Sequence, residues 1–170
     1  SGLSHIHVLF QTSGTFNGST GLVTSNGMTI NGGTFIAPSS LTVRSFDISG
    51  SATFDHNNGS ITCIGGNSTF ISSSARTLNN LTLDLIDEGG IATSANTTVA
   101  GTLTLTDGII NSGTLRSIGP VSIAPTFGTV GQGGGGGNIF FDEDGLAAPR
   151  HIDLPAGVRL PNIRVNDANI

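Results

Sequence analysis

The sequence predicts an all-β parallel β-helix, or β-solenoid, with coils of roughly 19 residues, and three observations predict it. First, a Thr-Phe pair recurs with its phenylalanine at Phe16, Phe35 and Phe54, a constant interval of one coil length, and again at Phe70 after a shorter interval. Second, short runs of alternating apolar and polar residues follow one another without the 3.6-residue period of helices. Third, Gly, Asn, Ser and Asp bound these runs, as turns require.

The repeat length sets the expected shape of one coil. Three strands of about three to five residues, joined by short turns, fill one repeat at ~3.3 Å per residue. Coils stacked at ~4.8 Å place equivalent residues in ladders. We therefore expect Phe16, Phe35, Phe54 and Phe70 to form one core ladder. The Asn-Gly and Asp-Gly pairs of the chain also fit tight hairpins, so an antiparallel β-sandwich is the alternative fold.

The expected strands follow the apolar runs in order along the chain, each with residues that suit a pleated surface. A break is expected at residues 84–90, where acidic residues and two glycines form a turn or bulge. The expected strands are residues 5–10, 28–30, 41–43, 46–48, 61–63, 81–85, 99–105, 121–123, 139–141, 151–154 and 163–165.

The composition of the chain changes twice, and these changes suggest three parts. Residues 1–130 are expected to be solenoid coils, residues 131–137 a glycine-rich loop, and residues 138–170 irregular terminal coils or a cap. Because Ser1 is not an initiator methionine, we expect a processed form or an excised piece of a longer chain.

Composition also excludes some functions. Charged residues make up 10% of the chain, which contains no lysine and has a formal net charge of −5. Nucleic-acid binding is therefore rejected, because neutralising phosphates requires clustered Lys and Arg. No run approaches the ~20 apolar residues of a membrane span. Cys63 is the only cysteine, so no internal disulfide is expected, and its strand-like surroundings predict a buried thiol.

Two stretches have similar patterns: residues 78–83 contain Asn-Asn-Leu-Thr-Leu, and residues 97–108 contain Thr-Leu-Thr-Leu. They resemble the repeats of large secreted bacterial surface proteins, the β-solenoids of autotransporter-passenger and filamentous-haemagglutinin type. The resemblance covers roughly residues 14–123. It implies an extracellular or cell-surface location and an elongated structural or adhesive role, and it brings no catalytic residues.

Two groups of residues have the chemistry of metal ligands. Asp142 and Asp144 precede Gly145, and closely spaced carboxylates with a tight glycine turn can begin a calcium loop. An ordinary acidic turn is favoured, because the residues that follow supply no side-chain oxygens. His5 and His7 share one strand face, but no third ligand lies nearby in the sequence. We therefore expect no cofactor, with calcium as the one candidate.

A catalytic role is the alternative function that parallel β-helices suggest. Polysaccharide lyases and hydrolases require clustered carboxylates with a cation, and Arg44, Asp47 and Asp55 are the residues that fit best. The chain has no Trp or Tyr to stack on sugar rings, so we expect no enzyme. A module that binds a receptor or surface glycans is the second alternative.

The two ends of the chain suggest self-association. Solenoids need polar terminal caps for solubility, and both ends of this chain are apolar and weakly charged. The sequence therefore predicts a non-enzymatic surface fibre, sheath or adhesive stalk, formed as a homopolymer or from like coils of a longer chain. The residues expected to make the end-to-end contact are Ile6, Val8, Phe10, Ile163 and Val165.

Overall fold

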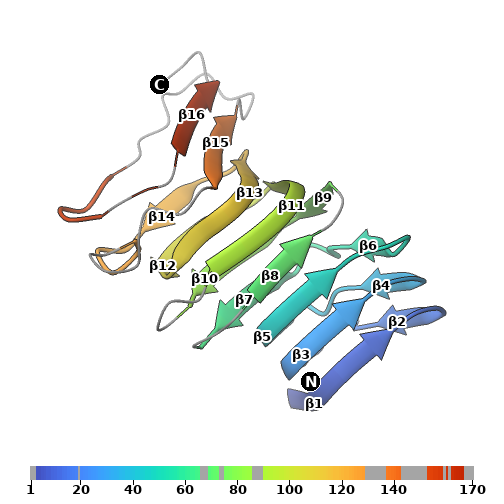
Figure 1. The fold of residues 1–170 in the computed structure, drawn as a ribbon. Coiled ribbons are helices and arrows are strands. Elements are labelled where there is room, and N and C mark those ends of the chain that lie inside the picture. The colour runs from blue at the N-terminus through green and yellow to red at the C-terminus, as the bar shows by residue number, and fades with distance from the viewer. Residues whose placement is uncertain are drawn as a thin grey trace.

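The protein is a stack of parallel β coils, which confirms the predicted parallel β-helix (Figure 1). The computed structural model describes residues 3–18, 20–65, 69–72, 75–85, 90–128, 137–142, 153–158, 160 and 162–166. Within these ranges there is no helix, and every pair of neighbouring strands is parallel. The alternative antiparallel sandwich is therefore wrong.

The strands of the described ranges are β1 (Leu3–Gln11), β2 (Thr15–Asn17), β3 (Leu22–Ile30), β4 (Thr34–Ile36), β5 (Ser40–Ile48), β6 (Thr53–Asp55), β7 (Ser60–Ile64), β8 (Thr69–Ser72), β9 (Arg76–Leu78), β10 (Asn80–Asp84), β11 (Gly90–Val99), β12 (Leu103–Asp107), β13 (Ile109–Ser117), β14 (Val121–Ile123), β15 (Asn138–Asp142) and β16 (Asn162–Asn166).

Each long strand of the first coils turns a corner. In β5 the side chains of Leu41 and Val43 are buried, and so are those of Phe46 and Ile48. In a straight strand the side chains alternate between the two sides. Because two residues, not one, separate Val43 from Phe46, a straight strand would place Phe46 and Ile48 on the side opposite to Leu41 and Val43. Both halves point inward because the backbone bends at Arg44. We call the half before the bend the first face of the coil and the half after it the second face.

A short strand closes each coil as its third face. Strands β2, β4 and β6 form a separate parallel sheet of three strands (Figure 1). The turn into β4 depends on Gly33, whose φ is +75°. A Cβ atom added there would collide with the carbonyl oxygen of Gly14 in the coil beneath. Glycine alone fits this corner, because it has no Cβ and tolerates a positive φ.

The phenylalanine ladder stands on the third face. Phe16, Phe35 and Phe54 are in register across β2, β4 and β6. The ring centroids of Phe16 and Phe35 lie 4.8 Å apart and those of Phe35 and Phe54 lie 5.9 Å apart, with the planes nearly parallel. Phe46 packs against the ladder from the second face, at 6.2 Å from Phe35. Phe35 is fully buried in this cluster.

Phe70 does not belong to this ladder, so that part of the prediction is wrong. The backbone of β8 pairs with the second-face half of β5 in the preceding coil, and this pairing places Phe70 in register with Phe46. The interval from Phe54 to Phe70 is shorter than one full coil, so the chain has not returned to the third face. The single strand β5 is followed in the next coil by two strands, β7 and β8, which pair with its two halves.

Two other expected strands differ from the structure. Residues 99–105 are not one strand: β11 ends at Val99, and β12 begins at Leu103 after a turn. Of the expected strand 151–154, Asp153 and Leu154 are not in a strand, and the other two residues lie outside the described ranges. The glycine-rich loop also lies outside them, apart from Gly137. Beyond it, β15 and β16 continue the stack by pairing in parallel with β13 and with each other.

The core is a set of aliphatic ladders that runs through the coils. On the first face one ladder consists of Leu41, Ile61, Leu81 and Leu103, which are in register and all buried. Cys63 lies in the neighbouring ladder and is fully buried, as the sequence predicts. The outer side of the same face carries a ladder of threonines, namely Thr24, Thr42, Thr62, Thr82 and Thr104.

Candidate assembly surface

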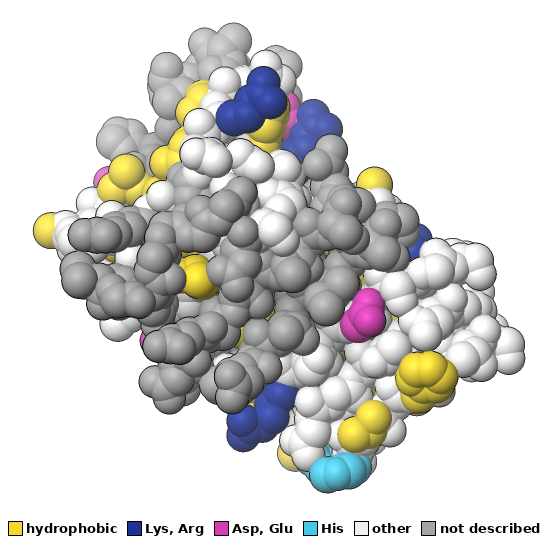
Figure 2. Space-filling model, viewed as in Figure 1, with side chains coloured by type: hydrophobic (Ala, Val, Ile, Leu, Met, Phe, Trp, Pro, Cys, Tyr) yellow, Lys and Arg dark blue, Asp and Glu magenta, His cyan; other side chains and the backbone are white. Residues whose placement is uncertain are grey.

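Strand β1 leaves one of its edges unpaired. It pairs in parallel with β3, and no strand of the described ranges pairs with its other edge. Natural sheets protect such edges with charges, prolines or bulges, because free N–H and C=O groups recruit further strands. Residues 1–43 contain no Lys, Arg, Asp or Glu. In Figure 2 the side chains over β1 and β2 are accordingly hydrophobic, uncharged polar or histidine. This edge has no protecting charge.

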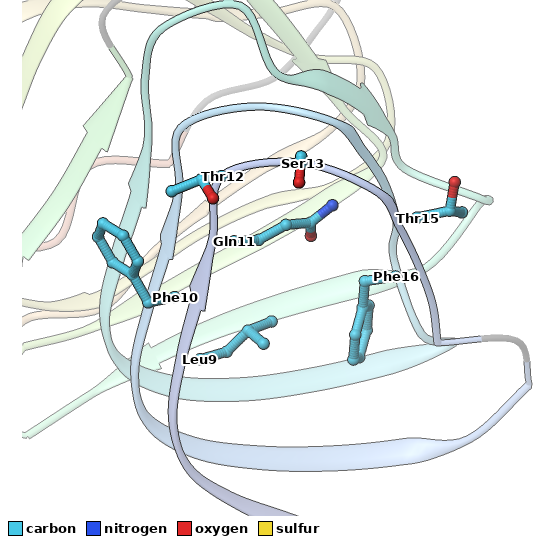
Figure 3. Close-up of a pocket in the computed structure, with 7 residues that line it drawn as sticks. All are labelled: Leu9, Phe10, Gln11, Thr12, Ser13, Thr15 and Phe16. Atoms are coloured by element: carbon cyan, nitrogen blue, oxygen red, sulfur yellow. The ribbon is translucent and has the colours of Figure 1, made fainter.

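The core is open beside this edge. A hollow of about 290 Å³, which we call the N-terminal hollow, is lined by residues of β1, β2 and the turn between them (Figure 3). Leu9, Gln11 and Phe16 point into the first coil, whereas Phe10 and Thr15 point away from it. The lining residues are Leu9, Phe10, Gln11, Thr12, Ser13, Thr15 and Phe16.

The next coil shows what a covering coil does to these positions. Leu9 is in register with Met28, and Phe16 is in register with Phe35. Met28 and Phe35 are buried, whereas Leu9 and Phe16 are only half-buried. The difference arises because Met28 and Phe35 have a coil on each side, while Leu9 and Phe16 have a coil on one side only.

Gln11 is the polar member of an otherwise aliphatic ladder. It occupies the position that Ile30 and Ile48 hold in the next two coils. Its Nε2 donates hydrogen bonds to the carbonyl oxygens of Gly14 (3.1 Å) and Thr34 (3.0 Å), which hold the turn of the first coil. Its Oε1 is buried without a hydrogen-bond partner. Leaving this buried carbonyl oxygen without a donor costs free energy.

The predicted contact residues of the N-terminal end do not all lie on the same side of the coil. Val8 and Phe10 are 62% and 65% exposed and lie on the outer side of the coil. Ile6 is partly buried against the core. Sequence reasoning missed Leu9, Gln11 and Phe16, which line the N-terminal hollow. The signal for Leu9 is its register with Met28 and Phe46, which are inward residues of the next two coils.

The opposite end of the stack also has unpaired edges. Among the described residues β16 pairs only with β15, and β14 pairs only with β12. Ile163 and Val165 in β16 are 42% and 52% exposed. These two predicted contact residues therefore lie on a surface that is accessible to another coil.

The predicted calcium ligands have different outcomes. Asp142 is buried at the end of β15, where its carboxylate forms an ion pair with Arg116 and accepts a hydrogen bond from Asn166 Nδ2 at 3.0 Å. Asp144 lies outside the described residues. In the part of the chain that the structure describes, no group of three His, Cys, Asp or Glu side chains lies close enough to hold a metal ion. The expectation of no cofactor, with calcium as the one candidate, stays a prediction.

The histidines of β1 have separate polar partners on β3. His5 Nδ1 lies 2.9 Å from Thr24 Oγ1, and Asn26 Nδ2 donates to His7 Nδ1 at 3.0 Å. The register of β1 and β3 skips His7 and Asn26, which therefore stand at the corner between the faces. Each imidazole thus stabilises the pairing of the first two coils.

The three residues considered for catalysis lie on different parts of the coil. Arg44 is exposed at the corner, Asp47 lies on the outer side of the second face, and Asp55 ends the third-face strand β6. Asp55 accepts a hydrogen bond from the backbone N–H of Asn57. No ion pair joins these three residues within the described ranges.

The single thiol is held in its neutral form. Burial among aliphatic side chains raises the pKa of Cys63 to about 12, because the thiolate would lose its hydration. A thiol in this state is a poor nucleophile and a poor metal ligand. Cys63 therefore acts as a small apolar residue of the core.

The fold and these surfaces define a β-solenoid protein. No family model, no curated protein and no solved structure matches the chain. No helix among the described residues is long and apolar enough to cross a membrane.

Proposed function

We propose that this chain is a non-catalytic, extracellular structural β-solenoid that builds a surface fibre, sheath or adhesive stalk by head-to-tail stacking. The added coils come from a second copy or from like coils of a longer chain. The observation that carries the proposal is the unpaired edge of β1, which runs beside the N-terminal hollow in a stretch without formal charge. The extracellular location rests on the resemblance of residues 78–83 and 97–108 to secreted surface repeats.

The free energy of such stacking comes from two sources. An added coil covers Leu9 and Phe16, and full burial of an apolar side chain contributes about 1.5–3 kcal/mol. The same coil pairs with the backbone groups on the edge of β1 that no described strand pairs with. Because the two ends of a stack are different surfaces, the contact is heterologous and does not close. It therefore yields an open fibre.

A matched pair of lysine variants tests the proposal. Leu9→Lys places a charge in the N-terminal hollow, where an added coil would have to bury it. Phe10→Lys places the same charge one residue later, on the outer side of the coil. We expect Leu9→Lys to prevent filament growth and Phe10→Lys to permit it, as measured by sedimentation velocity and negative-stain imaging.

Circular dichroism of both variants provides the control for folding. Leu9 belongs to the terminal coil and is only half-buried, so the β-rich spectrum should persist in both variants. Equal filament growth of the two folded variants would show that the hollow is not the contact surface, and the proposal would then fail.

A further inference from the structure

A column of alternating cation and aromatic ring stands on the outer side of the neighbouring strands β13, β15 and β16. Arg116 in β13, Phe140 in β15 and Arg164 in β16 are in register. The Cζ atom of Arg116 lies 5.7 Å from the centroid of the Phe140 ring, and that of Arg164 lies 5.4 Å from it. Figure 2 shows two Lys or Arg side chains close together at the end of the molecule where Figure 1 places β15 and β16. We call these three residues the Arg-Phe-Arg column.

Buried groups fix the position of the column. The carboxylate of Asp142, which is 6% exposed, forms an ion pair with Arg116 and accepts a hydrogen bond from Asn166. Arg116 nevertheless keeps 46% of its side-chain surface exposed. Arg164 is exposed, and no carboxylate of the described residues is paired with it. Among the described residues, one positive charge of the column therefore has no carboxylate partner.

The chemistry of this column fits anionic groups. A guanidinium that lies over a ring keeps the N–H groups of its edge available, and these match the two oxygens of a carboxylate or sulfate. The ring between the two cations limits their movement, so less entropy is lost when a ligand binds. The two guanidiniums are two rungs apart, at ~9.6 Å for a spacing of ~4.8 Å per coil. Every second sugar of an extended β-linked chain presents its substituent on the same side at a similar spacing.

We propose that the Arg-Phe-Arg column binds the carboxylate or sulfate groups of an acidic polysaccharide that lies along the solenoid axis. Arg164 supplies the charge that is free to pair, Phe140 positions both guanidiniums, and Arg116 contributes the donors that Asp142 does not use. The site is independent of end-to-end stacking, because the three side chains lie on the outer side of their strands, opposite the buried Leu115, Ile139 and Phe141. A nucleic acid fits less well, because its dense phosphates require more clustered Lys and Arg than the two arginines of this column.

Calorimetric titration with defined oligosaccharides tests this site. The probes are a β-1,4-linked mannuronate oligosaccharide, which carries carboxylates, and a heparin fragment, which also carries sulfates. A neutral cello-oligosaccharide of equal length and an oligothymidylate serve as comparisons. We expect one or both acidic sugars to bind, with affinity that falls as salt rises, and the stronger of the two identifies the anionic group. The neutral sugar should not bind.

Three variants connect binding to the column. Arg164→Gln should weaken binding about tenfold, the value of one charge-assisted hydrogen bond, and Phe140→Leu should weaken it because the guanidiniums lose their support. Arg44→Gln removes an equally exposed cation at a distant corner and should leave the affinity unchanged. Arg164 and Arg44 are both exposed, so these two variants should keep the wild-type melting temperature.

Three results would overturn the proposal. They are an absence of binding to both acidic sugars, equal affinities of the Arg164→Gln and Arg44→Gln variants, and binding of the oligothymidylate as tight as that of the sugars.

Discussion

Phe35 contacts more rings than any other phenylalanine in the ladder of the third face. Phe16 and Phe54 stack on its two faces and Phe46 packs against it at an angle. Replacing a fully buried ring with alanine leaves a cavity that the surrounding coils cannot fill. We expect Phe35→Ala to lower the free energy of unfolding by roughly 3–5 kcal/mol, measured by denaturant titration. Phe10→Ala is the control, since Phe10 is 65% exposed and its loss should change stability little.

Two glycines of the same region allow a test of backbone geometry. Gly33 has a φ of +75° and faces the backbone of the coil beneath it, whereas a Cβ at Gly27 would meet no atom within 4 Å. Gly33→Ala should destabilise the protein by at least about 1–2 kcal/mol, the cost of a left-handed conformation for alanine, plus the steric clash. Gly27→Ala should be neutral or slightly stabilising. Thermal unfolding of the two variants measures the difference, and equal melting temperatures would contradict this account of the corner.

Burial of the Cys63 thiol makes the free energy of unfolding depend on pH in the alkaline range. Its pKa is about 12 in the folded protein and near the ordinary value of 9.0 when the chain is unfolded. Between these two values the unfolded chain has lost the proton and the folded chain has kept it, so stability falls as pH rises above about 9. Denaturant titrations from pH 8 to pH 11 should show this decline in the wild type. The decline should be smaller in Cys63→Ala, and equal slopes would show that other groups cause it.

Among the strands, the sequence predicted the phenylalanine ladder of β2, β4 and β6 but not the corner between β7 and β8. The constant spacing of Phe16, Phe35 and Phe54 predicted the third face, because coils of equal length repeat their inward residues in register. The same reasoning failed at Phe70, because the segment between β7 and β8 lengthens one corner. A ladder position depends on the length of every preceding corner, and a local motif does not contain this information.

The Arg-Phe-Arg column was unpredictable for a related reason. Its members are spaced more widely along the chain than the phenylalanines of the first repeats, and a glycine-rich segment lies between two of them. The three side chains become neighbours only through strand pairing. The N-terminal hollow was not predicted: the sequence identified the apolar opening strand and proposed Ile6, Val8 and Phe10 as contact residues, and that contact stays a prediction.

The apolar opening strand taken alone predicts that deleting residues 1–10 abolishes fibre growth, and the stacked arrangement changes this prediction. Deleting residues 1–10 removes most of β1 and exposes the edge of β3, which is equally free of formal charge and has Met28 beneath it. We therefore expect the truncated chain to remain β-rich and to keep associating through β3. Sedimentation velocity measures this, and a strictly monomeric truncated chain would show that β1 itself carries an essential contact. Leu9→Lys is the sharper variant, because it alters the open end without creating a new one.

Across the whole molecule, the distribution of charge makes the two ends of the stack of coils different. The first 43 residues carry no formal charge, whereas the charges of the described residues beyond them include the Arg116–Asp142 pair and Arg164 near the other end. In the proposed fibre, such a stack would grow with a defined polarity, because each heterologous contact joins two different ends. The outer faces stay available along such a fibre, so stacking and binding at the Arg-Phe-Arg column are compatible.

The proposed function requires this chain to stack end to end through the open coil at β1. Negative-stain imaging of the purified wild type over a range of concentrations tests it most directly, because an open heterologous contact gives filaments whose length increases with concentration at constant width. We predict unbranched filaments one solenoid wide, which shorten on dilution and do not form with Leu9→Lys. Isolated short rods at every concentration, with the same appearance in the wild type and in Leu9→Lys, would contradict the claim.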